Sequence, residues 1–184
     1  MPKIKNKKKL VRRADSHKKA DHYMRGIYME IGNGDDYSYD FKGCAIGCLA
    51  TPTAKATIKK DTFLKKFWNT TKNTFSLDQQ DAIKILKKDF GIAPSLTRVA
   101  ECVFESYEIL GDEDSDKAVY EWPSRFARAL PEGKSITNRD VAKFIEEAGG
   151  KTYYLINGEV TIGHAPEDID DKLIDWLNSK KGRN

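Results

Sequence analysis

The stretch Phe41-Lys-Gly-Cys-Ala-Ile-Gly-Cys-Leu-Ala50 is the part of this 184-residue chain from which the fold is most readily argued. Two of the three cysteines lie four residues apart in it, and each directly follows a glycine. Small residues in this pattern suit a tightly packed turn, or the start of a short helix, where larger side chains do not fit. The same pattern also suits a reactive thiol pair or half of a metal site. The residues alone leave these interpretations open.

The overall composition limits the class of protein. The chain is 39% hydrophobic and 33% charged, with a mean hydropathy of −0.64, which is typical of a soluble globular protein. No apolar run approaches the roughly 20 residues of a transmembrane helix, and no apolar segment follows the basic N-terminus as a secretion signal would require. Three cysteines do not indicate a secreted disulfide scaffold. These features predict a cytoplasmic protein without a membrane partner.

The net charge of +4 conceals a strongly basic N-terminus. Residues 1–20 carry nine Lys or Arg and one acid, a net charge of +8, so the remaining residues carry −4. We expect residues 1–13 to form a basic disordered arm, for which a solubilising role is the simplest interpretation. The alternative role is attraction to phosphate backbones. The candidate nucleic-acid contacts are Lys5, Lys7, Lys8, Lys9, Arg12 and Arg13.

The hydrophobic pattern predicts an α+β fold that is predominantly α-helical, with two small hairpins. Helices are expected over residues 61–72 and from Ser76, which forms a capping-box pattern with Gln79. A small N-terminal β-hairpin is predicted from residues 27–31 and 37–41. A C-terminal β-hairpin is predicted around Asn157-Gly158, followed by a last helix.

These elements suggest three segments along the chain. The first is the basic arm, residues 1–13. The second is a compact helical domain over residues 14–148, which contains Cys44 and Cys48. The third is a hairpin–helix element over residues 151–184, which follows a Gly-Gly break.

Cys44 and Cys48 are candidate catalytic residues, since a thiol with a lowered pKa and a neighbouring base can act as a nucleophile. His17 is the candidate base, because it falls on the apolar side of its predicted helix. Asp21, one turn later, is placed to orient the imidazole ring. The alternative is structural: two buried cysteines that act as small apolar groups, and a buried histidine paired with an aspartate.

Two weaker patterns concern a metal site and a pair of carboxylates. A zinc site that includes both cysteines would be completed by one or more of Cys102, His17, His22 and His164, and none of these has a zinc-finger spacing. Glu101 and Glu105 lie one turn apart and suit acid–base chemistry, but a solvated helix face is the favoured interpretation. We therefore predict no metal and no cofactor.

One ordered set of residues runs through residues 14–145. It comprises His17-x-x-Ala20-Asp21, Gly26-x-Tyr28, Lys42-Gly-Cys-Ala-Ile-Gly-Cys48, Phe90-Gly-Ile92, Glu101-x-x-Phe104-Glu105 and Trp122-Pro-x-x-Phe126. This set resembles a family of small uncharacterised proteins from bacteria and their phages, whose distinctive part is the motif Lys-Gly-Cys-Ala-aliphatic-Gly-Cys. The family carries no assigned activity. The resemblance implies a setting inside a bacterial host cell.

The sequence thus favours a small accessory protein of the phage or mobile-element type, which binds a host protein or a nucleic-acid complex. One alternative is an enzyme that uses Cys44 or Cys48 with His17 and Asp21. A second alternative is a nucleic-acid-binding protein that acts through the basic arm. The sequence does not indicate whether the protein is a monomer or an oligomer.

Overall fold

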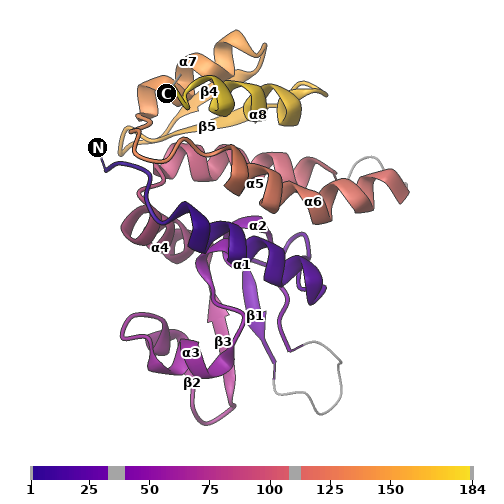
Figure 1. Cartoon of the computed structure of the whole chain (residues 1–184), viewed down its shortest axis with the longest axis vertical. Helices are drawn as coiled ribbons and strands as arrows, with labels where there is room; N and C mark the ends of the chain where they lie inside the picture. Colours follow the sequence, from indigo (N-terminus) through magenta and orange to yellow (C-terminus); the bar gives the residue numbers. More distant parts are fainter. Residues whose placement is uncertain (1, 33–39, 108–112, 183–184) are drawn as a thin grey trace.

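The computed structural model describes residues 2–32, 40–107 and 113–182, and its elements lie in layers along the long axis of the molecule (Figure 1). The first half contains α1 (Lys7–Lys19), β1 (Met29–Ile31), α2 (Ala45–Ala50), α3 (Lys55–Lys60), the 3-10 helix η1 (Leu64–Phe67), β2 (Trp68–Asn69), β3 (Thr74–Leu77) and α4 (Gln79–Phe90). The second half contains α5 (Pro94–Ser106), α6 (Glu113–Ala129), α7 (Asn138–Glu147), β4 (Lys151–Tyr154), β5 (Val160–His164) and α8 (Ile169–Ser179). The predicted α+β fold, predominantly α-helical, is confirmed. Among the described helices, none is both long and apolar enough to cross a membrane.

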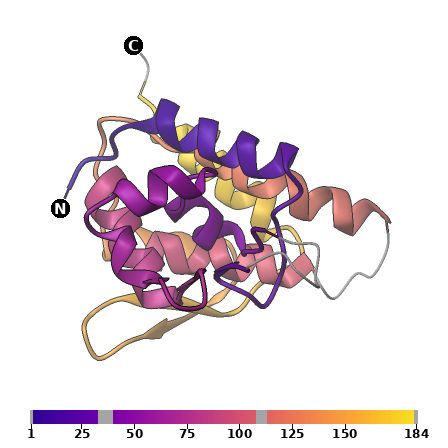
Figure 2. The same cartoon turned by 90° about the horizontal axis from the view of Figure 1, so that it is seen from below.

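The short helix α2 lies at the centre of the helical core. All of its 6 residues are buried, and α1, α4, α5 and α6 all contact it. The helix is short because Thr51 is extended and Pro52 follows, so the chain turns away. On the outside of this core, α1 packs alongside α6 (Figure 2).

Residues 2–13 have a defined structure, which corrects the expected disordered arm over residues 1–13; residue 1 lies outside the described residues. Residues 2–6 lead into α1, and the backbone of Ile4 exchanges hydrogen bonds with residues 133 and 134. The side chains of Ile4 and Leu10 are buried. Two apolar anchors therefore fix a segment whose high charge alone suggested disorder, because the lysines lie mostly on the outer side.

A three-stranded antiparallel sheet, with the order β1-β3-β2, forms the end of the molecule opposite the C-terminal hairpin (Figure 1). Phe75 of β3 lies opposite both Ile31 of β1 and Trp68 of β2. Within the described residues, β1 pairs with β3 and not with residues 40–41, and a single bridge joins Glu30 to Lys42, just beyond the predicted second strand. Residues 33–39, which include most of that predicted turn and second strand, lie outside the described residues.

One expected helix in this region is wrong, and a second is confirmed as α4 but starts later than expected. Residues 61–72 form η1, β2 and a turn, because the Asp61 carboxylate accepts from the N–H groups of Phe63 and Leu64 and closes a tight turn there. Ser76 lies in β3, where alternate residues are buried. The helix α4 begins later, and Asp78 caps it by accepting from the N–H of Asp81.

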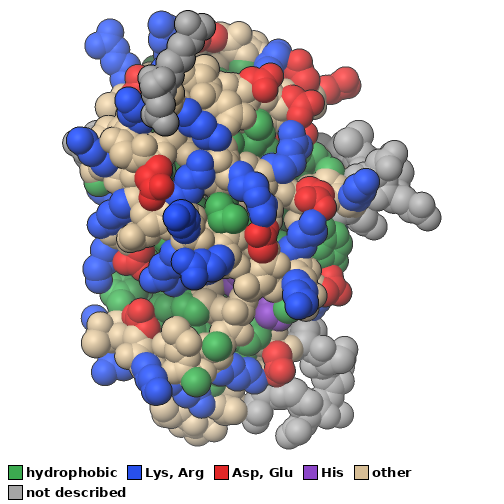
Figure 3. Space-filling model, in the orientation of Figure 1, with side chains coloured by type: hydrophobic (Ala, Val, Ile, Leu, Met, Phe, Trp, Pro, Cys, Tyr) green, Lys and Arg blue, Asp and Glu red, His purple; other side chains and the backbone are tan. Residues whose placement is uncertain are grey.

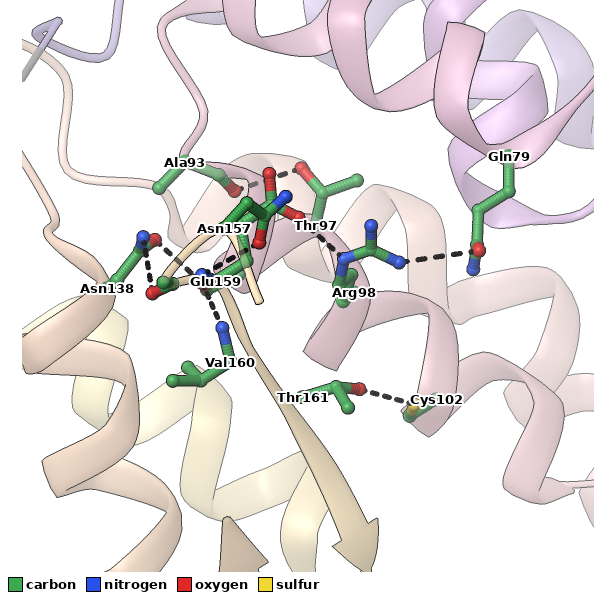
Figure 4. A network of polar contacts seen from close by, with 12 residues as sticks. Gln79, Ala93, Thr97, Arg98, Cys102, Asn138, Asn157, Glu159, Val160 and Thr161 are labelled. Carbon is green, nitrogen blue, oxygen red and sulfur yellow. Dashed lines mark hydrogen bonds and ion pairs between the residues drawn. The ribbon is translucent and has the colours of Figure 1, made fainter. Parts of the chain in front are cut away.

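The predicted C-terminal hairpin and helix are confirmed as β4, β5 and α8. Gly158 provides the positive φ of 79° that the turn requires. The hairpin contacts α5 and α7, and α8 packs on α6. Figure 4 shows polar contacts that hold it on α5, including the pair Arg98 Nε–Glu159 Oε2 at 3.0 Å and the contact of Cys102 Sγ with Thr161 Oγ1 at 3.8 Å.

Candidate functional site

The cysteine motif forms a close backbone contact, which we call the cysteine joint (residues 43–48). A Cβ atom on Gly47 would lie 1.4 Å from the carbonyl oxygen of Tyr28, and one on Gly43 would lie 2.7 Å from the same oxygen. No real side chain makes contacts this short, so both positions require glycine. The two glycines let the segment before β1 lie directly against α2.

The two thiols of the joint point into the core. Cys44 and Cys48 are both 0% exposed, and their Sγ atoms donate to the carbonyl oxygens of Tyr28 at 3.6 Å and Gly43 at 3.4 Å. Burial, and then the neighbouring Glu101, raise the pKa of both thiols well above the usual value. A nucleophilic cysteine needs the opposite shift and an accessible sulfur. In this arrangement the thiols act as small apolar groups.

His17, the candidate base, is buried and has both ring nitrogens engaged. Its Nε2 lies 2.7 Å from the carbonyl oxygen of Thr51, and its Nδ1 lies 2.8 Å from Nδ1 of His22. Because a carbonyl oxygen only accepts, the proton of neutral His17 lies on Nε2, and His22 donates from Nδ1. His22 also stacks on Phe41 with 4.8 Å between ring centroids. Burial lowers the pKa of His17 to about 4, so the ring is neutral at physiological pH.

Asp21, the predicted orienting group, does not contact His17 through a hydrogen bond in the structure. It is exposed, it has a positive φ of 57°, and its carbonyl oxygen accepts from Lys42 Nζ. The structure thus brings His17 near the cysteine joint without forming a Cys–His–Asp set. Over the residues that the structure describes, no group of three or more His, Cys, Asp or Glu residues is arranged to hold a metal ion.

Glu101 is the unexpected member of this region. The sequence placed it on a solvated face, but it is 4% exposed, because α5 is buried on nearly every side. Its Oε2 accepts from the N–H of Ile46 at 3.3 Å, and its buried Oε1 has no donor. Burial and the nearby Glu105 carboxylate raise the pKa of Glu101 to about 8. A protonated Glu101 can donate to Glu105, which accounts for the oxygen without a donor.

The predicted nucleic-acid contacts divide into two groups. Lys5, Lys8, Lys9 and Arg12 are exposed, and Lys7 is half-buried. Arg13 is buried instead, which corrects its assignment as a phosphate contact. Its guanidinium donates to the carbonyl oxygens of Leu49 at 3.2 Å and Ala50 at 3.1 Å, so it caps the C-terminal end of α2.

The exposed cations of the first group form what we call the α1 face (Lys5, Lys8, Lys9 and Arg12). Lys and Arg side chains are spread across the middle of the molecule in Figure 3, along the line of α1 in Figure 1. The ion pairs that α1 makes use Asp15 with Arg128 and Lys18 with Glu121. In the described part of the chain, no acid forms an ion pair with the α1 face.

A second basic region lies in the segment that the sequence assigned to a helix. Residues 55–72 contain six lysines and a single acid. They border a pocket of about 570 Å³, which we call the Trp68 pocket, lined by Lys59, Lys65, Lys66, Trp68, Thr70 and Asn73. Lys59 Nζ lies 4.4 Å from the centroid of the Trp68 ring. The sequence signal was the alternation of lysine pairs with aromatic residues, which a helical interpretation treated as an amphipathic pattern.

No family model matches this chain, and no curated protein and no solved structure is similar to it. The resemblance to bacterial and phage proteins therefore stays a prediction.

Proposed function

We propose that this protein binds nucleic acid through the α1 face. The observation that carries the proposal is that these four cations project from a segment with a fixed backbone and have no internal acidic partner. The inner side of the segment is anchored by Ile4, Leu10 and Ala14, which are all buried. The outer side therefore presents its charges in one arrangement, at little cost in chain entropy on binding.

Phosphate backbones are the ligand class that such a surface suits best. Lysine and arginine side chains displace condensed counterions from nucleic acid, and this supplies affinity without any reading of the base sequence. The charged side chain of Lys181 also lies near Lys7. Burial, and then the charge of Lys181, lower the pKa of Lys7. We expect binding that depends steeply on salt and little on sequence.

The enzyme alternative has less support from the geometry. Both candidate nucleophiles are buried with raised pKa values, and His17 has no free ring nitrogen. The broader class, an accessory protein of phages or mobile elements that meets a host protein in the bacterial cytoplasm, rests on the resemblance and stays a prediction.

Fluorescence anisotropy with labelled oligonucleotides tests the proposal. The triple variant K8A/K9A/R12A removes three charges of the α1 face, and K143A/K151A/K180A removes three exposed charges from α7, β4 and the end of α8. We expect the first variant to lose at least about tenfold in affinity, with a log–log salt slope smaller by about 2–3 between 50 and 200 mM salt. The second should bind like the wild type. Equal binding by both variants, or no binding by the wild type at 50 mM salt, would contradict the proposal.

A further inference from the structure

We infer that the Trp68 pocket binds single-stranded nucleic acid, with one base stacked on the indole ring and the flanking phosphates held by lysines. This inference rests on the proposed function, because it specifies the form of nucleic acid and adds a contact area beyond the α1 face. The pocket lies beside α3, which Figure 1 places below α1 along the long axis.

The indole ring is held ready for stacking. Trp68 belongs to β2, where it lies opposite Phe75, and the two ring centroids are 6.3 Å apart. Trp68 is half-buried against the core, and the ammonium of Lys59 lies over its ring. The ammonium occupies this electron-rich face, so a base stacks on it only once Lys59 has moved aside. Every base has a π-face that can take this place, and aromatic platforms of this kind bind single strands with little sequence preference.

Lysines surround this platform and provide the charge for phosphates. Lys65 and Lys66 are exposed, and neither forms an ion pair with a described acid. Lys59 donates to the Asn73 side chain at 3.4 Å and is free to turn toward a phosphate when a base covers the ring. None of the residues that line the pocket is acidic. The pocket therefore combines an apolar stacking surface with an uncompensated positive rim.

A single strand fits this combination better than a duplex or an acidic peptide. Bases inside a duplex are stacked on each other and cannot present a face to a side chain without being flipped out. An acidic peptide would use the lysines and leave the indole without a function. The volume of about 570 Å³ lies within the range of pockets that hold one compact organic group.

Tryptophan fluorescence provides the direct test. Titration of the full-length protein with an oligo(dT) of about 12 nucleotides, a length within the usual site sizes, should quench the emission of Trp68. The variant W68F should lose this quenching, whereas W176F, which removes the half-buried tryptophan of α8, should retain it. Trp122 is fully buried and serves as a constant background. Circular dichroism checks that W68F keeps the fold, which we expect because a phenylalanine ring preserves most of the contact with Phe75.

Affinity measurements give a second readout that does not depend on the fluorescence of Trp68. We expect W68A to weaken oligo(dT) binding between about 5-fold and 100-fold, and to leave binding of a duplex of the same length unchanged. The variant K65A/K66A removes two exposed amines, of which Lys66 also lies 5.6 Å from the Phe63 ring centroid, and should lower the salt slope for the single strand by about 1.4. The variant K143A/K151A loses the same charge at the other end of the molecule and should keep the wild-type salt slope.

The outcomes separate this inference from the proposed function. One outcome is that oligo(dT) binds in a salt-dependent way, without quenching and equally well to W68A and K65A/K66A. That result would contradict binding at the Trp68 pocket but would still support binding at the α1 face. Quenching by an acidic phosphopeptide but not by oligo(dT) would replace nucleic acid with a protein ligand. If no oligonucleotide binds at all, the proposed function and this inference fail together.

Discussion

The cysteine joint and the Trp68 pocket both contain residues that often carry chemistry, yet their surroundings differ in kind. Around the joint, the thiols of Cys44 and Cys48 and one oxygen of Glu101 have partners inside the protein. In the pocket, Lys65 and Lys66 face solvent and no described acid pairs with them. The joint carries the more distinctive sequence motif, while the pocket belongs to a segment that the sequence did not single out.

This contrast shows that a distinctive sequence motif does not by itself indicate a ligand site. Polar groups that are satisfied internally stabilise the fold and have little left to offer a ligand. Charges without internal partners keep their full capacity for a ligand of opposite sign. Substitutions of the two kinds of residue, with stability and binding measured separately, test this contrast.

The largest effect is expected at Gly47. A methyl group there would collide with the carbonyl oxygen of Tyr28, so Gly47→Ala should cost more than about 3 kcal/mol of unfolding free energy or prevent folding. Gly158→Ala is the matched control, since nothing lies near its Cβ and only its positive φ adds strain, of about 1–2 kcal/mol. Urea unfolding measures both. If Gly47→Ala were as stable as the wild type, the joint would not be a close backbone contact.

Acid should destabilise the protein through His17. The unfolded ring titrates near its ordinary pKa of 6.5 and the folded ring near 4, so the unfolded state binds more protons between these values. Stability is therefore lost as the pH falls from 6.5 toward 4, by on the order of 3 kcal/mol from this group. Urea unfolding across this range should show a shallower pH dependence for His17→Gln than for the wild type. Identical slopes would mean that folding does not lower the pKa of His17.

The fold class could be predicted from sequence because its signals are local. Asn157-Gly158 specifies a hairpin turn by itself, and the hydrophobic pattern fixed the helical class. The buried state of Glu101 could not be predicted in this way, since it arises when α5 is covered by other elements on several sides. Trp68 was misassigned for a different reason: β2 pairs with β3 across a short turn, and the helical spacing of the apolar residues concealed this local hairpin.

Glu101 should destabilise the protein as the pH rises. Its folded pKa is raised to about 8 from an ordinary 4.5, so the unfolded carboxyl loses its proton first and stability falls between these values. Glu101→Gln mimics the protonated form and should be more stable than the wild type above pH 8, by up to about 5 kcal/mol. The exposed Glu147→Gln on α7 serves as the control and should follow the wild type. A Gln variant that loses stability equally at every pH would argue against a protonated Glu101.

Two adjacent arginines give the finest test of the comparison. Arg13 donates to two buried carbonyl oxygens at the end of α2, and Arg13→Ala should lower the unfolding free energy by about 1–2 kcal/mol because they are left without donors. Arg12 is exposed on the α1 face, and Arg12→Ala should change stability by less than about 0.5 kcal/mol. Removal of its single phosphate contact should lower the salt slope of nucleic-acid binding by about 0.7–0.9, and the folded Arg13 variant should keep the wild-type slope. Arg13 would then stabilise the core, and its neighbour Arg12 would bind the ligand. Equal losses of binding in the two variants would mean that the charge of an arginine, and not its exposure, determines binding.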